Sequence, residues 1–231
     1  MLTERSFDIL EAAIREFIGS GDPVSSSLLY KRHDFGIRPA MIRAELGELA
    51  ERGYLEQPYH SAGRVPSNRG YEFFAERVIA AERAAARAEE LAALARRKAW
   101  AELLEYLSDH LGIATVAEES GGTVYKEGLE MLMEHLPWES RDAVMNVVKD
   151  FEALDRRLDS AKEIFDEDDG SLRVFIGRKS PVTKSDDLAV MAADYDTSDG
   201  KIFLFAIGPK RMDYEKAAAM FKGLKRALGS E

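Results

Sequence analysis

The sequence predicts an α+β protein with an N-terminal winged helix-turn-helix, a long connecting helix and a C-terminal α+β domain that holds a small antiparallel sheet. Three observations support this prediction. Short amphipathic helical segments, followed by a strand and a constrained loop, occupy residues 1–75. Strong helix formers, many of them alanine, cover residues 76–111. Apolar runs typical of strands lie between helical segments in residues 112–231.

Composition narrows the class of protein. The chain of 231 residues contains no cysteine, which excludes disulfides, thiol nucleophiles and thiolate metal sites. No apolar run approaches the roughly 18 residues that span a bilayer, and the amino end lacks the apolar core and cleavage site of a signal peptide. We therefore expect a soluble cytoplasmic protein without a membrane partner.

Charge is distributed unevenly along the chain. The net charge is −10, yet residues 30–70 carry seven Lys/Arg against five Asp/Glu, whereas residues 81–231 carry 22 basic and 30 acidic residues. A locally basic segment on an acidic chain is typical of a small DNA-binding domain joined to a regulatory domain. The difference is small, and alone it does not decide the function.

Three helices are predicted before residue 53. The first is amphipathic and ends at Gly19, and the second begins after Ser25, whose hydroxyl is a good helix cap. Pro39 suits the first position of the third helix, residues 39–52. The positions that this third helix is expected to bury are Ile42, Leu46 and Leu49. A short strand at 54–57 follows, and this order is that of a winged helix-turn-helix.

The loop that follows, residues 59–71, reads "YHSAGRVPSNRGY" and carries two cations. Gly63 is expected to adopt a positive φ, and Pro66 keeps the residue before it extended, so the backbone shapes the loop. That shape gives the cations fixed places. We expect Arg64 to enter a minor groove or to anchor the adjacent DNA backbone, and Arg69 to meet a phosphate near the start of the next helix.

The outer face of the third helix is the candidate surface for DNA. Ala40, Ala44 and Gly47 lie opposite the buried positions, with Arg43 on one flank and Met41 on the other. Small residues let a helix approach a groove closely, and arginine donates to guanine or phosphate. The helix by itself favours an ordinary exposed, solvated helix, whereas the three helices and the loop together favour DNA binding. The full set of predicted DNA-binding residues is Ser26, Lys31, Arg38, Pro39, Met41, Arg43, Ala44, Gly47, Ser61, Gly63, Arg64 and Arg69.

The remaining segments predict a helical connector and a sheet domain. Leucines along residues 76–111 either pair with a second chain or pack on the chain's own domain. Strands are predicted at 171–177, 186–196 and 201–208, with a hairpin turn at Asp199-Gly200. Helices are predicted at 126–136, closed by Pro137, at 140–165 and at 213–228.

No pattern typical of catalysis or metal binding occurs. His33, His60, His110 and His135 lie far apart, with no spacing suited to a shared metal. The acidic run at 166–170 lacks the spacing of an EF-hand loop. The sequence therefore predicts neither an enzyme nor a cofactor.

Two motifs indicate a family. "SAGRVP" at 61–66 and "IGPKRMDY" at 207–214 resemble the heat-inducible transcription repressor HrcA family, with similarity over residues 1–78 and, more weakly, 124–230. The resemblance implies a dimeric repressor that binds an inverted repeat in double-stranded DNA upstream of chaperone operons. It also implies a GAF-like C-terminal domain and the GroE chaperonin as the partner that maintains the active state.

Several departures accompany the resemblance. The chain is considerably shorter than a usual member between Ala86 and Val124, so the early sheet strands and the inserted dimerisation domain are expected to be largely absent. The family's Ser-Pro-Ala-Thr-Ile-Arg-Asn pattern becomes "RPAMIRA" at 38–44, and Ser27 replaces a frequent arginine. A regulator that responds to a small ligand and a winged-helix protein-interaction module remain alternatives to a DNA-binding repressor.

Overall fold

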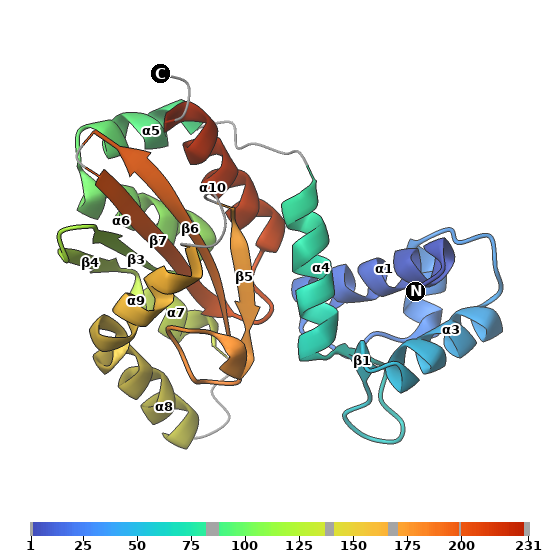
Figure 1. Cartoon of the computed structure of the whole chain (residues 1–231). Coiled ribbons are helices and arrows are strands. Elements are labelled where there is room, and N and C mark those ends of the chain that lie inside the picture. The colour runs from blue at the N-terminus through green and yellow to red at the C-terminus, as the bar shows by residue number, and fades with distance from the viewer. Residues whose placement is uncertain (1, 82–87, 137–140, 166–170, 199, 229–231) are drawn as a thin grey trace. The chain divides into compact units, whose positions relative to one another are not determined.

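The computed structural model describes residues 2–81, 88–136, 141–165, 171–198 and 200–228 (Figure 1). The chain forms two compact units, Met1–Arg77 and Val78–Glu231. The first unit is mostly helical and holds a two-stranded sheet, and the second holds a five-stranded sheet in which every pairing is antiparallel. The predicted α+β class with a small antiparallel sheet is confirmed.

The first helix, α1 (Glu4–Ser20), begins and ends through identifiable caps. The hydroxyl of Thr3 accepts a hydrogen bond from the N–H of Ser6 at 3.1 Å. The helix ends at Gly21, which has a φ of 75° and donates its N–H to the carbonyl of Phe17. The prediction that the helix ends at Gly19 is wrong by one residue, because the left-handed turn that caps the helix falls at Gly21.

The next two helices follow the predicted pattern. Helix α2 (Ser26–Arg32) starts after Ser25, whose hydroxyl accepts from the N–H of Leu28 at 3.1 Å. Helix α3 (Pro39–Glu51) has proline at its first turn, and Gly53 follows it with a φ of 75°. The predicted buried positions of α3 are confirmed: Ile42, Leu46 and Leu49.

A two-stranded sheet and a fourth helix complete the first unit. Strand β1 (Leu55–Glu56) pairs antiparallel with β2 (Val65–Pro66), and α4 (Asn68–Ala80) follows. The ring of Phe73 on α4 lies edge-on to the rings of Phe7 and Tyr54, at 5.6 and 5.4 Å between centroids. These contacts fasten α4 to α1 and to the start of β1.

The sheet of the second unit has the order β4-β3-β7-β6-β5. Its strands are β3 (Ala114–Glu119), β4 (Val124–Glu127), β5 (Arg173–Ile176), β6 (Leu188–Thr197) and β7 (Gly200–Pro209). The three later strands were predicted, but β3 and β4 were not, and the expectation that early strands are largely absent is wrong. Strand β3, with the sequence ATVAEE, escapes a search for alternation because five successive residues are buried and two of them, Thr115 and Glu118, are polar, so apolar and polar positions do not alternate.

Helices cover both faces of this sheet (Figure 1). The elements on one face are α7 (Leu129–His135), α8 (Arg141–Glu152), α9 (Leu154–Lys162) and the short η1 (Glu163–Phe165). Those on the other are α5 (Ala88–Arg96), α6 (Trp100–Leu111) and α10 (Tyr214–Leu228), and η2 (Gly177–Lys179) follows β5. The side chains of β6 alternate between the two faces of the sheet. Val190 packs in the core under α7–α9. Tyr195 lies on the other face, where its hydroxyl donates a hydrogen bond to the carbonyl of Phe221 on α10.

The predicted connector belongs to the second unit. It forms two helices, α5 and α6, separated at 97–99, where Lys98 has a φ of 56°. Helix α5 packs on α10, and α6 packs on β3 and β4. Its leucines are buried within the unit: Leu91, Leu103, Leu104 and Leu107. Of the two alternatives, packing on the chain's own domain is the one observed for residues 88–111.

The predictions at Pro137, 166–170 and Asp199 lie outside the described residues.

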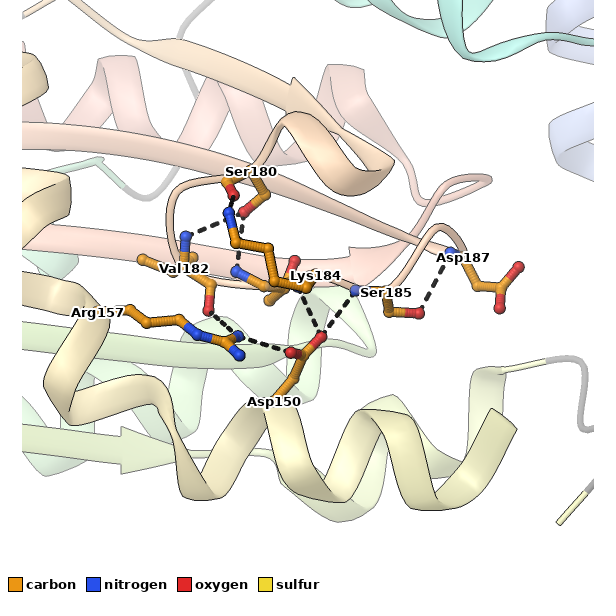
Figure 2. Close-up of polar contacts among 8 residues, drawn as sticks. Asp150, Arg157, Ser180, Val182, Lys184, Ser185 and Asp187 are labelled. Atoms are coloured by element: carbon orange, nitrogen blue, oxygen red, sulfur yellow. Dashed lines mark hydrogen bonds and ion pairs between the residues drawn. The ribbon is translucent and has the colours of Figure 1, made fainter. Parts of the chain in front are cut away.

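A buried carboxylate fastens the segment before β6 to the helices below it (Figure 2). Asp150 of α8 is 4% exposed and accepts a hydrogen bond from the guanidinium of Arg157 on α9 at 2.6 Å. Its other oxygen accepts from the backbone N–H groups of Lys184 and Ser185, both at 2.8 Å. Charge-assisted bonds of this kind hold an irregular segment that has no ladder partners of its own.

The substitution Asp150→Asn is expected to lower the free energy of unfolding of the second unit by about 3 kcal/mol, because buried donors lose their acceptor. Urea denaturation followed by tryptophan fluorescence measures this, since both tryptophans lie in the second unit. The matched control is Asp159→Asn, whose side chain is 82% exposed and which we expect to change stability by less than about 0.5 kcal/mol. Equal losses in the two variants would contradict the role given to Asp150.

Candidate nucleic-acid interface

The outer face of α3 combines small residues with one cation. Ala40, Arg43 and Ala44 are exposed, and Met41 is 48% exposed, an unusual value for a large apolar side chain. No atom lies within 4 Å of a Cβ built on Gly47, so the helix backbone is open at that point. The face predicted from helical spacing therefore forms as expected, and a flat ligand can approach it closely.

Two further predicted residues flank this face. Arg38 occupies the cap position of α3, but it caps through its carbonyl, which accepts from the N–H of Met41 at 2.9 Å and of Ile42 at 3.2 Å. Its side chain makes no capping bond and is exposed. Lys31 is exposed in the last turn of α2. Both cations are thus accessible beside α3.

The loop between β1 and β2 is held closed by its own hydrogen bonds. The side-chain amide of Gln57 donates to the carbonyls of His60 at 2.9 Å and Ala62 at 3.0 Å. The N–H of Ala62 donates to the carbonyl of Tyr59, also at 2.9 Å. Tyr59 is 62% exposed, and Ser61 is exposed beside it. The loop therefore presents an aromatic ring and a hydroxyl from a defined backbone.

The base of the loop is joined to the segment before α2. Val24 and Arg64 exchange two backbone hydrogen bonds, each 2.8 Å long. A Cβ on Gly63 would lie 2.5 Å from the carbonyl oxygen of Val24, which no side chain tolerates. The prediction that Gly63 has a positive φ is wrong. Glycine is needed here because the two backbones approach each other closely, not because of the backbone angle.

The substitution Gly63→Ala is expected to break the Val24–Arg64 bridge and destabilise the first unit by about 2 kcal/mol, since two buried backbone bonds are lost. Amide hydrogen exchange at Val24 and Arg64 should accelerate. Gly19→Ala is the control, because a Cβ at Gly19 meets no atom within 4 Å. Unchanged protection of both amides in Gly63→Ala would show that the close approach is not required.

Arg69 is fastened to the body of the unit. Its guanidinium donates to the carbonyl of Arg52 at 2.8 Å and to the Tyr54 hydroxyl at 3.3 Å. It also stacks over the Tyr54 ring, 4.4 Å from the centroid. These bonds connect α4 to the end of α3. The contact between Arg69 and a DNA phosphate was predicted from the place of Arg69 in the loop. Such a contact would have to compete with the hydrogen bonds that the guanidinium already makes within the first unit.

A hollow of about 340 Å³ lies between α2, α3 and the loop, and we call it the loop hollow. Its polar lining includes Ser25, Ser26, Ser27, Arg43, His60 and Arg64, and none of the residues that line it is acidic. Ser26 is only 6% exposed, so it faces this hollow and not open solvent. The Nε atom of Arg64 is buried and has no hydrogen-bond partner among the described residues. The hollow thus collects donors and positive charge.

A second hollow in the same unit has the opposite character. It lies near the start of α1 and is lined by Arg5 and four acidic residues, Glu4, Asp8, Asp34 and Glu45. An anion is repelled there and attracted to the loop hollow. The first unit therefore has a cationic hollow at α3 and the loop and a mainly acidic hollow near the start of α1.

The structure brings most predicted residues to one side of the first unit. Arg43, Ser61, Gly63 and Arg64 meet around the loop hollow, and Met41, Ala44 and Gly47 lie on the open face of α3. The site also includes residues that the sequence analysis did not select: Ser25, Ser27, Gln57, Tyr59 and His60. A sequence signal existed only for Tyr59, an aromatic residue directly after Pro58 in a polar loop.

Groups that could hold a metal ion and helices that could cross a membrane are both absent from the described part of the chain. There, no three His, Cys, Asp or Glu side chains gather as a metal site would require. In the same residues, no helix has both the length and the apolar character needed to cross a membrane.

Fold and site together define an α+β protein of two units, in which a small helical unit with a cationic loop hollow precedes a sheet covered by helices. Comparison then places the chain in a family. The model of the HrcA protein C-terminal domain matches residues 72–218, and the chain belongs to the HrcA family.

Relatives named heat-inducible transcription repressor HrcA match shorter stretches. The protein of Clostridium perfringens (strain SM101 / Type A) is 42% identical over 91 residues, 39% of this chain and 27% of that protein. The protein of Brevibacillus brevis (strain 47 / JCM 6285 / NBRC 100599) is 48% identical over 79 residues, 34% of this chain and 23% of that protein. The chain is therefore matched to only about a quarter of the length of these relatives.

A solved crystal structure of a hypothetical protein has the same fold. It superposes with a TM-score of 0.76 over 99% of this chain and 98% of its own, at 16% sequence identity. At that identity the likeness concerns the fold alone.

Proposed function

We propose that the protein is a transcriptional repressor of heat-shock and chaperone genes, and that its first unit binds double-stranded DNA. Residues 1–75 are then a winged-helix DNA-binding domain, with the β1–β2 loop as its wing. The observation that carries the proposal is the open, small-residue face of α3 beside a loop hollow that has two arginines and no acidic residue. The names of the relatives agree with it.

In this proposal α3 enters the major groove. Ala40, Ala44 and Gly47 let its backbone approach the groove floor, and Arg43 donates to a base edge or phosphate. Met41 replaces a polar residue of the family pattern, so its exposed thioether side chain contacts thymine methyl groups. Arg38 and Lys31 neutralise phosphates on either side of the helix.

The second unit is proposed as the regulatory part. Residues 112–231 form a reduced GAF-like domain, and residues 76–111 are the helical connector that joins it to the DNA-binding domain. Repression from an inverted repeat requires a homodimer, because each half-site takes one copy of α3. The buried leucines of α5 and α6 are already in use, so the dimer needs another surface. Heat and the GroE chaperonin tune the activity of the dimer in the cytoplasm.

The substitution Arg43→Ala is expected to weaken binding to an inverted-repeat duplex about tenfold, because a base or phosphate contact is lost. Gel-shift titration of the full chain, with a duplex from an inverted repeat upstream of chaperone genes, measures the change. The control is Arg5→Ala, which removes the same charge from the acidic hollow of the first unit. If the two variants lose affinity equally, α3 is not the recognition helix.

The substitution Gly47→Ala separates stability from recognition. Its Cβ meets open space in the middle of a helix, so the first unit should gain about 0.5–1 kcal/mol in stability. The same methyl group would stand between the α3 backbone and the groove floor, so DNA affinity should fall while stability rises. A thermal melt and a gel shift on the same sample test this, and an unchanged affinity would place α3 farther from the DNA.

The exposed Tyr30, Met41 and Tyr59 also suit a protein partner, and this favours a protein-interaction module as the second candidate function. The two candidates differ in their response to salt. DNA binding weakens steeply with salt because each phosphate contact releases counterions, whereas an apolar protein interface responds weakly.

A further inference from the structure

The loop hollow has the donors of an oxyanion site. The hydroxyl of Ser25 accepts from the N–H of Leu28, so its own hydrogen remains available to donate. Ser26 and Ser27 add two more hydroxyls, and Arg43 and Arg64 add guanidinium groups. Guanidinium and hydroxyl donors are the groups that hold phosphate oxygens in proteins. An acid-free hollow is notable in a chain whose net charge is −10.

Arg64 distinguishes this hollow from an ordinary basic surface. Its backbone N–H and carbonyl are both bonded to Val24, so the position of its Cα is set by the fold. Its side chain is not held in this way, because the Nε atom is buried and has no partner among the described residues. A buried donor without an acceptor costs free energy unless a ligand supplies the acceptor. The backbone of Arg64 is therefore fixed, while its guanidinium gains a hydrogen bond if it turns to a ligand in the hollow that supplies an acceptor.

We infer that the loop hollow binds one phosphate group, with the guanidinium of Arg64 as its charged donor. This rests on the proposed function: the phosphate belongs to the DNA backbone, one in each half-site. Bound there, it connects α2, α3 and the wing through a single group and sets how deeply α3 enters the groove. Of the two contacts expected for Arg64, minor-groove insertion and anchoring of the DNA backbone, the inference selects the backbone, because Arg64 lies at the base of the loop and not at its exposed tip.

The test scans a binding duplex with methylphosphonate linkages, each of which removes one phosphate charge. The duplex is one that the full-length protein selects from a random library. A methylphosphonate linkage at one position per half-site should weaken DNA binding by the wild-type protein about tenfold. The same linkage should have little further effect on DNA binding by Arg64→Gln. Arg64→Gln should also reduce the magnitude of the slope of log affinity against log salt by about one per half-site.

Two variants keep the result interpretable. Arg64→Lys keeps the positive charge but lacks the Nε donor and the planar guanidinium. Compared with Arg64→Gln, it should therefore restore part of the salt dependence of DNA binding. It should restore little of the sensitivity to the one methylphosphonate position. Arg5→Gln removes the same charge elsewhere and should leave the scan unchanged. Hydrogen exchange at Val24 reports whether each variant keeps the loop bridge. If wild type and Arg64→Gln respond identically to every neutralised linkage, the inference is wrong and DNA binding stands.

A free oxyanion is the other source of the same chemistry. If the wild-type protein binds no DNA, the proposed function fails, and inorganic phosphate is then titrated against ¹⁵N-labelled protein while the Arg64 Nε signal is followed. A saturable shift of this signal with phosphate, absent when chloride is added at equal ionic strength, would show that the hollow binds phosphate as a small-molecule ligand. No shift in that titration would overturn the site itself.

Discussion

The candidate interface depends on one short antiparallel contact, the pair of backbone hydrogen bonds between Val24 and Arg64. It joins the segment before α2 to the base of the wing, which are far apart in the sequence. Gly63 is required because any side chain there would collide with the Val24 carbonyl. The loop hollow exists only because this contact places Arg64 beside the serines of α2 and close to α3. A wing without it would carry its cation on an unanchored loop.

The second unit uses buried polar bonds in a comparable way. Asp150 collects an arginine from α9 and two backbone N–H groups from the segment before β6. In both units an irregular segment is anchored by hydrogen bonds to a part of the chain that is distant in sequence, because buried backbone donors and acceptors must be satisfied. The difference is that Asp150 has all its partners within the fold, whereas the guanidinium of Arg64 lacks one at Nε.

The burial of leucines of α5 and α6 limits the surfaces through which the protein can form a dimer. A run of leucines and alanines is typical of a helix that pairs with another chain. It is equally typical of a helix that packs on a sheet of its own chain. Helices α5 and α6 satisfy their apolar sides on α10, β3 and β4 within the same unit. The shortened chain has therefore not converted this segment into a free pairing helix. Residues 112–231 also contain the early strands β3 and β4, which complete the five-stranded sheet.

Local chemistry determined much of this protein from sequence alone. Ser25, Pro39 and the Ile42–Leu46–Leu49 spacing specify helices through caps and periodicity, which act within a few residues. The open face of α3 followed from the same spacing. Tertiary structure alone decided what depends on contacts between distant segments. Examples are the close approach that Gly63 permits, the capture of Arg69 by Tyr54, and the pairing of β3, in which the buried Thr115 and Glu118 interrupt any apolar pattern that the sequence could show. The sequence placed Arg64 in a loop; only the bridge to Val24 brought it to a hollow where its Nε donor has no acceptor within the described residues.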